Sequence, residues 1–123
     1  MSIKSVAAKL FASKIYHKTQ AWANKPVETQ NEIFKSLISD AKETVFGKDH
    51  HFKKIKTIDD FQKNVPVRDY EDLKSYIDRV KQGEENILWK GKPIYFAKTS
   101  GTTSGAKYIP LTKESMPSHI KAS

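Results

Sequence analysis

The sequence predicts an α/β fold that is mostly helical and ends in a short strand–loop–strand unit. Two observations predict this class. Apolar residues recur at helical spacing through most of residues 3–82. Two short runs rich in β-branched and aromatic residues then fall within residues 94–112, on either side of a segment rich in glycine, serine and threonine. With 123 residues the chain holds one domain at most.

The first predicted helix covers residues 3–22, where Ile3, Leu10 and Phe11 follow helical spacing. All five charges before residue 28 are lysines, which suggests a basic helix lying on a membrane surface. However, Lys14 stands one turn from Leu10, so cations fall on the apolar face. We therefore expect this helix to pack on the rest of the protein, with its lysines reaching out to solvent.

A second helix is predicted over residues 28–46. Thr29 and Glu32 stand three residues apart and form a capping-box pattern at its start. Apolar residues follow at helical spacing, and Gly47 is expected to end the helix.

Further along, the pattern predicts a short helix at 58–63 and a longer one at 69–82, which Asp69 caps. A strand–loop–strand is predicted at about 94–112, and Thr112–Ser115 resembles another helix cap. Two short strands cannot form a sheet of useful size. We therefore expect the chain to be the opening part of a longer polypeptide.

The helices at 28–46 and 69–82 are expected to pack on one another around aromatic side chains, which are Trp22, Phe34, Phe46, Phe61, Tyr76 and Trp89. Trp89 has a second interpretation as a surface residue beside a turn. The adjacent pair His50 and His51 has no acidic or thiol partner at ligand spacing, so no metal site is predicted.

The formal net charge of +8 raises the possibility of nucleic-acid binding. However, the lysines are scattered along the chain, and only Arg68 and Arg79 are arginines, the residues that best contact phosphates and bases. The chain has no cysteine and no apolar run near the roughly 20 residues that span a bilayer. We expect a cytoplasmic protein with no nucleic-acid or membrane partner.

The segment from Thr99 to Lys107 is the most informative part of the chain. It holds five hydroxyl side chains, two glycines and one lysine. Glycines let backbone N–H groups converge, hydroxyls donate further hydrogen bonds, and a lysine supplies positive charge. A phosphate group is the predicted ligand, and the candidate binding residues are Thr99, Ser100, Gly101, Thr102, Thr103, Ser104, Gly105 and Lys107.

The composition of this segment allows two other interpretations. The P-loop pattern requires a glycine where this chain has Ala106 and a Ser or Thr where it has Tyr108. Pro110 also favours a strand instead of the helix that follows a P-loop, so a P-loop NTPase is not expected. A ligand-free hairpin loop remains an alternative, because Gly, Ser and Thr are common turn residues.

The segment resembles the phosphate-binding signature of the adenylate-forming superfamily, Ser/Thr-Ser-Gly-Ser/Thr-Thr-Gly followed by a lysine. Ser104 stands where that signature has glycine, a departure shared with the auxin-responsive acyl acid–amido synthetase family. Upstream residues resemble the same family in order and spacing: Phe46-Gly47, Asp60-Phe61, Val65-Pro66-Val67-Arg68-Asp69-Tyr70-Glu71, Tyr76-Ile77 and Gly83-Glu84. The resemblance covers residues 28–115 and suggests a bacterial-type member.

This resemblance implies that residues 1–123 are a truncated N-terminal portion of a large adenylate-forming domain. Such enzymes use ATP and Mg²⁺ to adenylate a carboxylic acid and then pass the acyl group to the amine of an amino acid. The implied donors to the β- and γ-phosphates are the hydroxyls of Ser100, Thr102, Thr103 and Ser104. The implied roles of Gly101 and Gly105 are close backbone approach, and Lys107 would supply charge.

The resemblance also implies that the nucleoside contacts, the acid pocket and the mobile C-terminal domain lie beyond residue 123. The chain therefore holds no complete catalytic set, and we expect it to be inactive without the remainder of the same polypeptide. Two alternatives stay open. One is a ligase that passes the acyl group to coenzyme A. The other is a non-catalytic basic helical module that binds an acidic partner.

Overall fold

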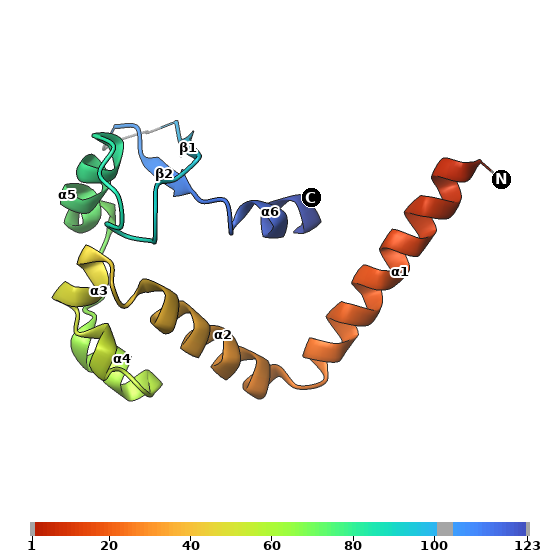
Figure 1. Cartoon of the computed structure of the whole chain (residues 1–123), viewed down its shortest axis with the longest axis horizontal. Helices are drawn as coiled ribbons and strands as arrows, with labels where there is room; N and C mark the ends of the chain where they lie inside the picture. Colours follow the sequence, from red (N-terminus) through yellow and green to blue (C-terminus); the bar gives the residue numbers. More distant parts are fainter. Residues whose placement is uncertain (1, 101–104, 123) are drawn as a thin grey trace. The chain divides into compact units, whose positions relative to one another are not determined.

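The computed structural model describes residues 2–100 and 105–122 (Figure 1). It is mostly helical and carries one two-stranded sheet near its C-terminal end, as the sequence predicted. The elements are α1 (Ile3–Ala23), α2 (Pro26–Ala41), α3 (Val45–Asp49), the 3-10 turn η1 (Phe52–Lys54), α4 (Ile58–Asn64), α5 (Tyr70–Lys81), β1 (Tyr95–Lys98), β2 (Tyr108–Leu111) and α6 (Met116–Ala122). The chain divides into two compact units, Met1–Ser36 and Leu37–Ser123.

The first unit consists of α1 and the beginning of α2. The N–H of Asn24 donates to the carbonyl of Gln20 at 3.0 Å and ends α1. The apolar side chains of Leu10 and Phe11 are exposed, and Trp22 is 50% exposed, so its expected place in the core is wrong. The predicted packing of α1 on the rest of the protein stays a prediction.

The start of the second helix differs from its prediction. Helix α2 begins at Pro26, and the N–H of Thr29 donates to the carbonyl of Lys25 at 3.0 Å. Thr29 therefore lies within the first turn and does not cap the helix. A proline suits the first helical position, because its missing N–H would have no partner within the helix there.

The end of this helix differs as well, since α2 stops at Ala41 and a separate helix, α3, begins at Val45. The N–H groups of Val45 and Phe46 donate to the carbonyls of Asn86 and Ile87, at 2.8 and 3.0 Å. In a continuous helix they would donate to carbonyls four residues earlier. The predicted helix 28–46 is therefore divided by bonds to a distant loop.

Gly47 does not end a helix but lies buried inside α3. A Cβ atom at this position would overlap the carbonyl oxygen of Ala41. The glycine is needed there because two stretches of backbone approach closely.

The core of the second unit forms where α2, α5 and the segment after α3 meet. Its buried apolar residues are Ile38, Ala41, Phe52, Ile55, Ile77, Val80 and Ile87. Phe46 joins α5 to η1, because the centroid of its ring lies 5.3 Å from that of Tyr76 and 5.9 Å from that of Phe52. Of the predicted helix 28–46, Phe46 thus contacts α5, and it belongs to the separate helix α3.

His50 belongs to the same core. It is buried, it stacks on Phe46 with ring centroids 4.0 Å apart, and its Nδ1 lies 2.8 Å from the carbonyl oxygen of Phe46. The described residues contain no group of acidic, histidine or cysteine side chains that could hold a metal ion.

Helices α4 and α5 begin at well-formed caps. Thr57 and Asp60 form a full capping box at the start of α4. Asp69 accepts a hydrogen bond from the N–H of Asp72 at 3.0 Å and caps α5, as predicted.

None of the helices in the described part of the chain combines the length and the apolar character that crossing a membrane requires.

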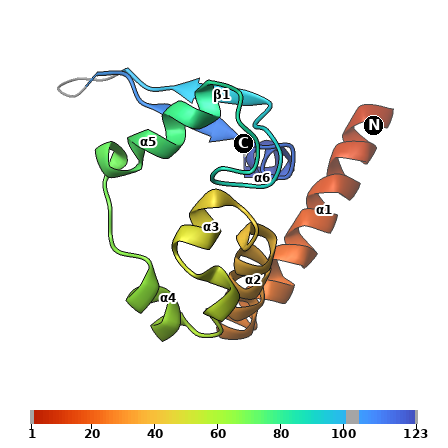
Figure 2. The same cartoon turned by 60° about the vertical axis from the view of Figure 1, so that its left-hand side comes forward.

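The hairpin pairs β1 and β2 as antiparallel strands, with Tyr95 opposite Leu111 and Lys98 opposite Tyr108. Both views place α5 beside this hairpin (Figures 1 and 2), and α5 contacts β2. After β2, Thr112 and Ser115 exchange hydrogen bonds in a turn, and α6 begins at Met116. The strand–loop–strand is therefore held against a helix of the core.

Candidate phosphate-binding site

The two ends of the predicted phosphate loop are held together by Thr99 and Lys107. The N–H of Thr99 donates to the carbonyl of Lys107 at 3.0 Å, and the N–H of Lys107 donates to Thr99 Oγ1 at 3.3 Å. This extends the hairpin by one pair beyond Lys98 and Tyr108. The predicted residues Gly101, Thr102, Thr103 and Ser104 lie outside the described residues.

The other predicted site residues lie at the tip of the hairpin. Thr99, Ser100 and Gly105 are exposed, and Lys107 is half-buried. Gly105 has a φ of +82° with open space around it. Other residues would be strained in this conformation, so the backbone itself requires glycine at this point.

The start of β2, next to the loop, carries a contact that sequence reasoning missed. The N–H of Tyr108 donates to the hydroxyl oxygen of Tyr70 at 2.9 Å, which ties β2 to the first turn of α5. The ammonium of Lys107 lies 5.7 Å from the centroid of the Tyr70 ring. Lys107, the residue before β2, thus lies beside Tyr70, the same side chain that binds the N–H of Tyr108.

Two further lysines face the ring of Tyr108. Lys81 Nζ lies 4.3 Å from the ring centroid and Lys98 Nζ lies 6.0 Å from it. We call Tyr70, Lys81, Lys98, Lys107 and Tyr108 the tyrosine–lysine cluster. One signal in the sequence pointed to this cluster, since lysines flank the Gly/Ser/Thr segment on both sides.

The cluster carries mostly uncompensated positive charge. Lys81 lies 3.6 Å from Asp78 Oδ1. The pKa of Asp78 is lowered chiefly by its hydrogen bond from Lys74, and Lys81 contributes less. Within residues 2–100 and 105–122, neither Lys98 nor Lys107 forms an ion pair with a carboxylate. Positive charge is therefore concentrated at this end of the hairpin, which would favour an anion there.

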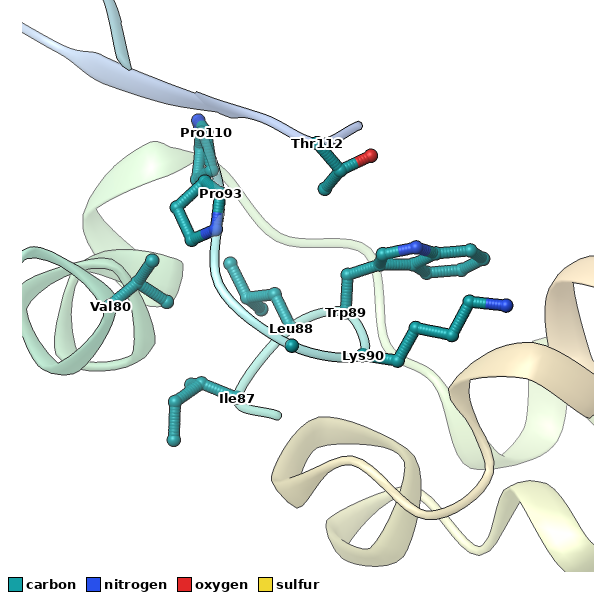
Figure 3. Close-up of a pocket in the computed structure, with 9 residues that line it drawn as sticks. Val80, Ile87, Leu88, Trp89, Lys90, Pro93, Pro110 and Thr112 are labelled. Carbon is teal, nitrogen blue, oxygen red and sulfur yellow. The ribbon is translucent and has the colours of Figure 1, made fainter. Parts of the chain in front are cut away.

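A cavity of about 20 Å³ lies at the opposite end of the strands (Figure 3). Its lining includes Val80, Ile87, Trp89, Pro110 and Thr112. The indole Nε1 of Trp89 is buried with no hydrogen-bond partner among the described residues. Such a volume suits one water molecule, and a nucleotide is far larger. Trp89 is half-buried and lines this cavity together with Ile87 of the core and Pro110 of β2. This position favours its interpretation as a core residue over that as a surface residue.

Comparison with known proteins gives one family. The model of the GH3 family N-terminal domain matches residues 15–123. The chain is 49% identical over 65 residues, 51% of its length, to indole-3-acetic acid-amido synthetase GH3.15 of Arabidopsis thaliana. It is 37% identical over 63 residues, 50% of its length, to jasmonoyl–L-amino acid synthetase JAR4 of Nicotiana attenuata. It is 46% identical over 48 residues, 38% of its length, to 4-substituted benzoates-glutamate ligase GH3.12 of Arabidopsis thaliana.

Residues 15–123, which include the helical core and both strands of the hairpin, therefore match the N-terminal domain of one family. The chain is a member of the GH3 family and matches its N-terminal domain. The matching part of the chain spans 11%, 11% and 8% of the lengths of the three relatives, in the order given above. These relatives are plant proteins, and the expectation of a bacterial-type member stays a prediction.

Proposed function

We propose that this chain is the N-terminal part of an ATP-dependent acyl acid–amido synthetase. In the complete polypeptide, the carboxylate oxygen of an acid would attack the α-phosphorus of ATP, and the bond to the departing pyrophosphate would break. The amine of an amino acid would then attack the acyl-adenylate, giving an amide and AMP. Family membership and the printed names of the relatives support this reaction class.

The observation that carries the proposal is the hairpin that brings Thr99 and Lys107 together. These bonds join the residues at the two ends of the hydroxyl-rich segment, and the adjacent Tyr108 is bonded to Tyr70 of α5. Hydroxyls and N–H groups fixed in advance around a phosphate stabilise the charge that develops as pyrophosphate leaves. We assign this role to the eight predicted loop residues, with ATP as the nucleotide and Mg²⁺ as its counter-ion.

The proposal includes the rest of the polypeptide as a necessary partner, because the matching part of the chain spans only 11%, 11% and 8% of the lengths of the three relatives. It also includes a small-molecule carboxylic acid and an amino acid as substrates. The absence of cysteine fits a cytoplasmic enzyme.

Pyrophosphate release by the full-length polypeptide tests the proposal. MgATP, a panel of carboxylic acids and the twenty amino acids are supplied, and the products are identified by mass spectrometry. We expect pyrophosphate, AMP and an amide with at least one acid. A thioester formed only when coenzyme A is present would favour the acyl-CoA ligase instead. No pyrophosphate with any acid would contradict both.

One observation favours a second candidate, a basic module that binds an acidic partner. A surface cavity of about 350 Å³ is lined by Lys42, Lys48, Lys53 and Lys54 together with His51. Lys53 pairs with Glu43 at 2.8 Å, and the pKa of Glu43 is lowered chiefly by that hydrogen bond. Binding through this cavity would weaken steeply between low and moderate salt and would not depend on MgATP.

A further inference from the structure

The tyrosine–lysine cluster lies directly beside the proposed phosphate site, but the proposed function assigns no role to four of its five residues. Its central contact is the hydrogen bond from the N–H of Tyr108 to the hydroxyl of Tyr70 at 2.9 Å. Tyr70 is the first residue of α5, and Tyr108 is the first residue of β2. The contact therefore joins the beginning of a core helix to the strand that follows the loop.

The strand register explains why this N–H is free to reach α5. Thr99 and Lys107 are a hydrogen-bonded pair, so the next pair, Lys98 and Tyr108, is a non-hydrogen-bonded one. The N–H of Tyr108 consequently faces away from β1, and the hydroxyl of Tyr70 accepts it. One side chain thus fixes the backbone directly after Lys107.

Side-chain alternation places the lysines around the same point. Lys98 and Tyr108 are opposite one another and share a face of the hairpin, where Lys98 and Lys81 both lie within 6.0 Å of the Tyr108 ring centroid. Lys107 alternates to the other face, 5.7 Å from the Tyr70 ring. Three ammonium groups therefore lie around Tyr70 and Tyr108, where the two strands meet the loop.

We propose that Tyr70 is a positioning residue for the ATP phosphates, and that Lys81 and Lys98 add positive charge to the Lys107 end of the same site. This inference rests on the proposed function, since it assigns residues to the phosphate site of that reaction. A polyphosphate carries several negative charges, so one lysine at the end of the loop compensates only part of them. Contact with an aromatic ring holds an ammonium group in position, which suits a site that is formed before its ligand arrives.

The test uses the full-length polypeptide with Tyr70→Phe, Lys81→Gln and Lys98→Gln, and with Lys56→Gln as the control for an exposed lysine elsewhere. We expect Tyr70→Phe to raise the KM for ATP about 3- to 10-fold, as the loss of one hydrogen bond would. The KM values for the acid and the amino acid should not change. Calorimetry should show weaker pyrophosphate binding by both lysine variants, with a smaller salt dependence than in the wild type. Lys98→Arg should restore the binding that Lys98→Gln loses.

The outcomes separate this inference from the proposed function. Normal ATP and pyrophosphate affinities in Tyr70→Phe, Lys81→Gln and Lys98→Gln would overturn the inference even if the wild type makes an amide. If the wild type binds pyrophosphate but activates no acid, the proposed function fails while calorimetry still tests the cluster. If Tyr70→Phe unfolds at a lower temperature than the wild type, the two lysine variants decide the result.

Discussion

The hydroxyl of Thr44 joins the end of one helix to the start of the next. Its Oγ1 accepts a hydrogen bond from the N–H of Gly47 at 2.9 Å and donates one to the carbonyl of Ala41 at 2.7 Å. Thr44 is only 1% exposed, so water cannot replace these bonds. The buried side chain of Thr44 therefore stabilises the break between α2 and α3, together with the bonds from Val45 and Phe46 to the carbonyls of Asn86 and Ile87.

We predict that Thr44→Val lowers the free energy of unfolding by about 1–3 kcal/mol. Valine keeps the shape of threonine but leaves the Gly47 N–H and the Ala41 carbonyl without this partner. Thr44→Ser retains the hydroxyl and should retain most of the stability. Urea unfolding followed by circular dichroism measures both variants, and equal stability of Thr44→Val and the wild type would contradict the prediction.

Gly47→Ala should destabilise the same junction for a steric reason. The added Cβ would overlap the backbone oxygen of Ala41, and backbone cannot move aside as a flexible side chain can. We expect a loss of about 1–3 kcal/mol, the usual cost of overpacking a core. Ser39→Ala, at an exposed position on α2, is the matched control and should change little. The prediction is wrong if both variants unfold at the same urea concentration.

This junction also shows what the sequence could not predict. Helical spacing runs from Ile33 to Val45 without interruption, so the pattern predicted one helix. The break depends on carbonyls of Asn86 and Ile87, some forty residues away along the chain. Local periodicity carries no information about such partners. The burial of Ile87, at 2% exposure, was missed for the same reason.

Other features were predictable because their causes are local. Asp69 caps α5 through a residue three positions away, and the hairpin follows from two short runs around a glycine-containing segment. The loop residues Thr99 and Lys107 could be proposed from composition alone. Tyr70 could not, because its contact with Tyr108 joins positions that no short motif relates.

The capping box of α4 makes stability depend on pH. Asp60 Oδ2 accepts hydrogen bonds from the N–H groups of Lys56 and Thr57, both at 3.0 Å. The Lys56 bond is the main cause that lowers the pKa of Asp60, followed by the bonds with Thr57. A lowered pKa in the folded state adds stability above the unfolded value of about 4, and this stability is lost as pH falls through the folded value.

We therefore predict that Asp60→Asn is less stable than the wild type between pH 6 and 8, and that the difference shrinks as the pH falls below about 4. Urea unfolding of both proteins across this range measures it. Asp59→Asn, which removes a charge from the same first turn but not from the box, should have a smaller effect. A difference that stays constant down to pH 2 would show that the carboxylate bonds are not its cause.

The loop hydroxyls provide the sharpest test of the proposed chemistry. Thr102 and Thr103 are assigned as donors to the phosphates of ATP, so Thr102→Ala or Thr103→Ala in the full-length polypeptide should lower turnover on the order of 100-fold, as for the loss of one transition-state donor. Pyrophosphate release at saturating MgATP measures it. Ser75→Ala, at an exposed position on α5, removes a hydroxyl away from the hairpin and should leave turnover unchanged. Wild-type rates in both threonine variants would remove these residues from the site, because neither hydroxyl would then stabilise the departing pyrophosphate.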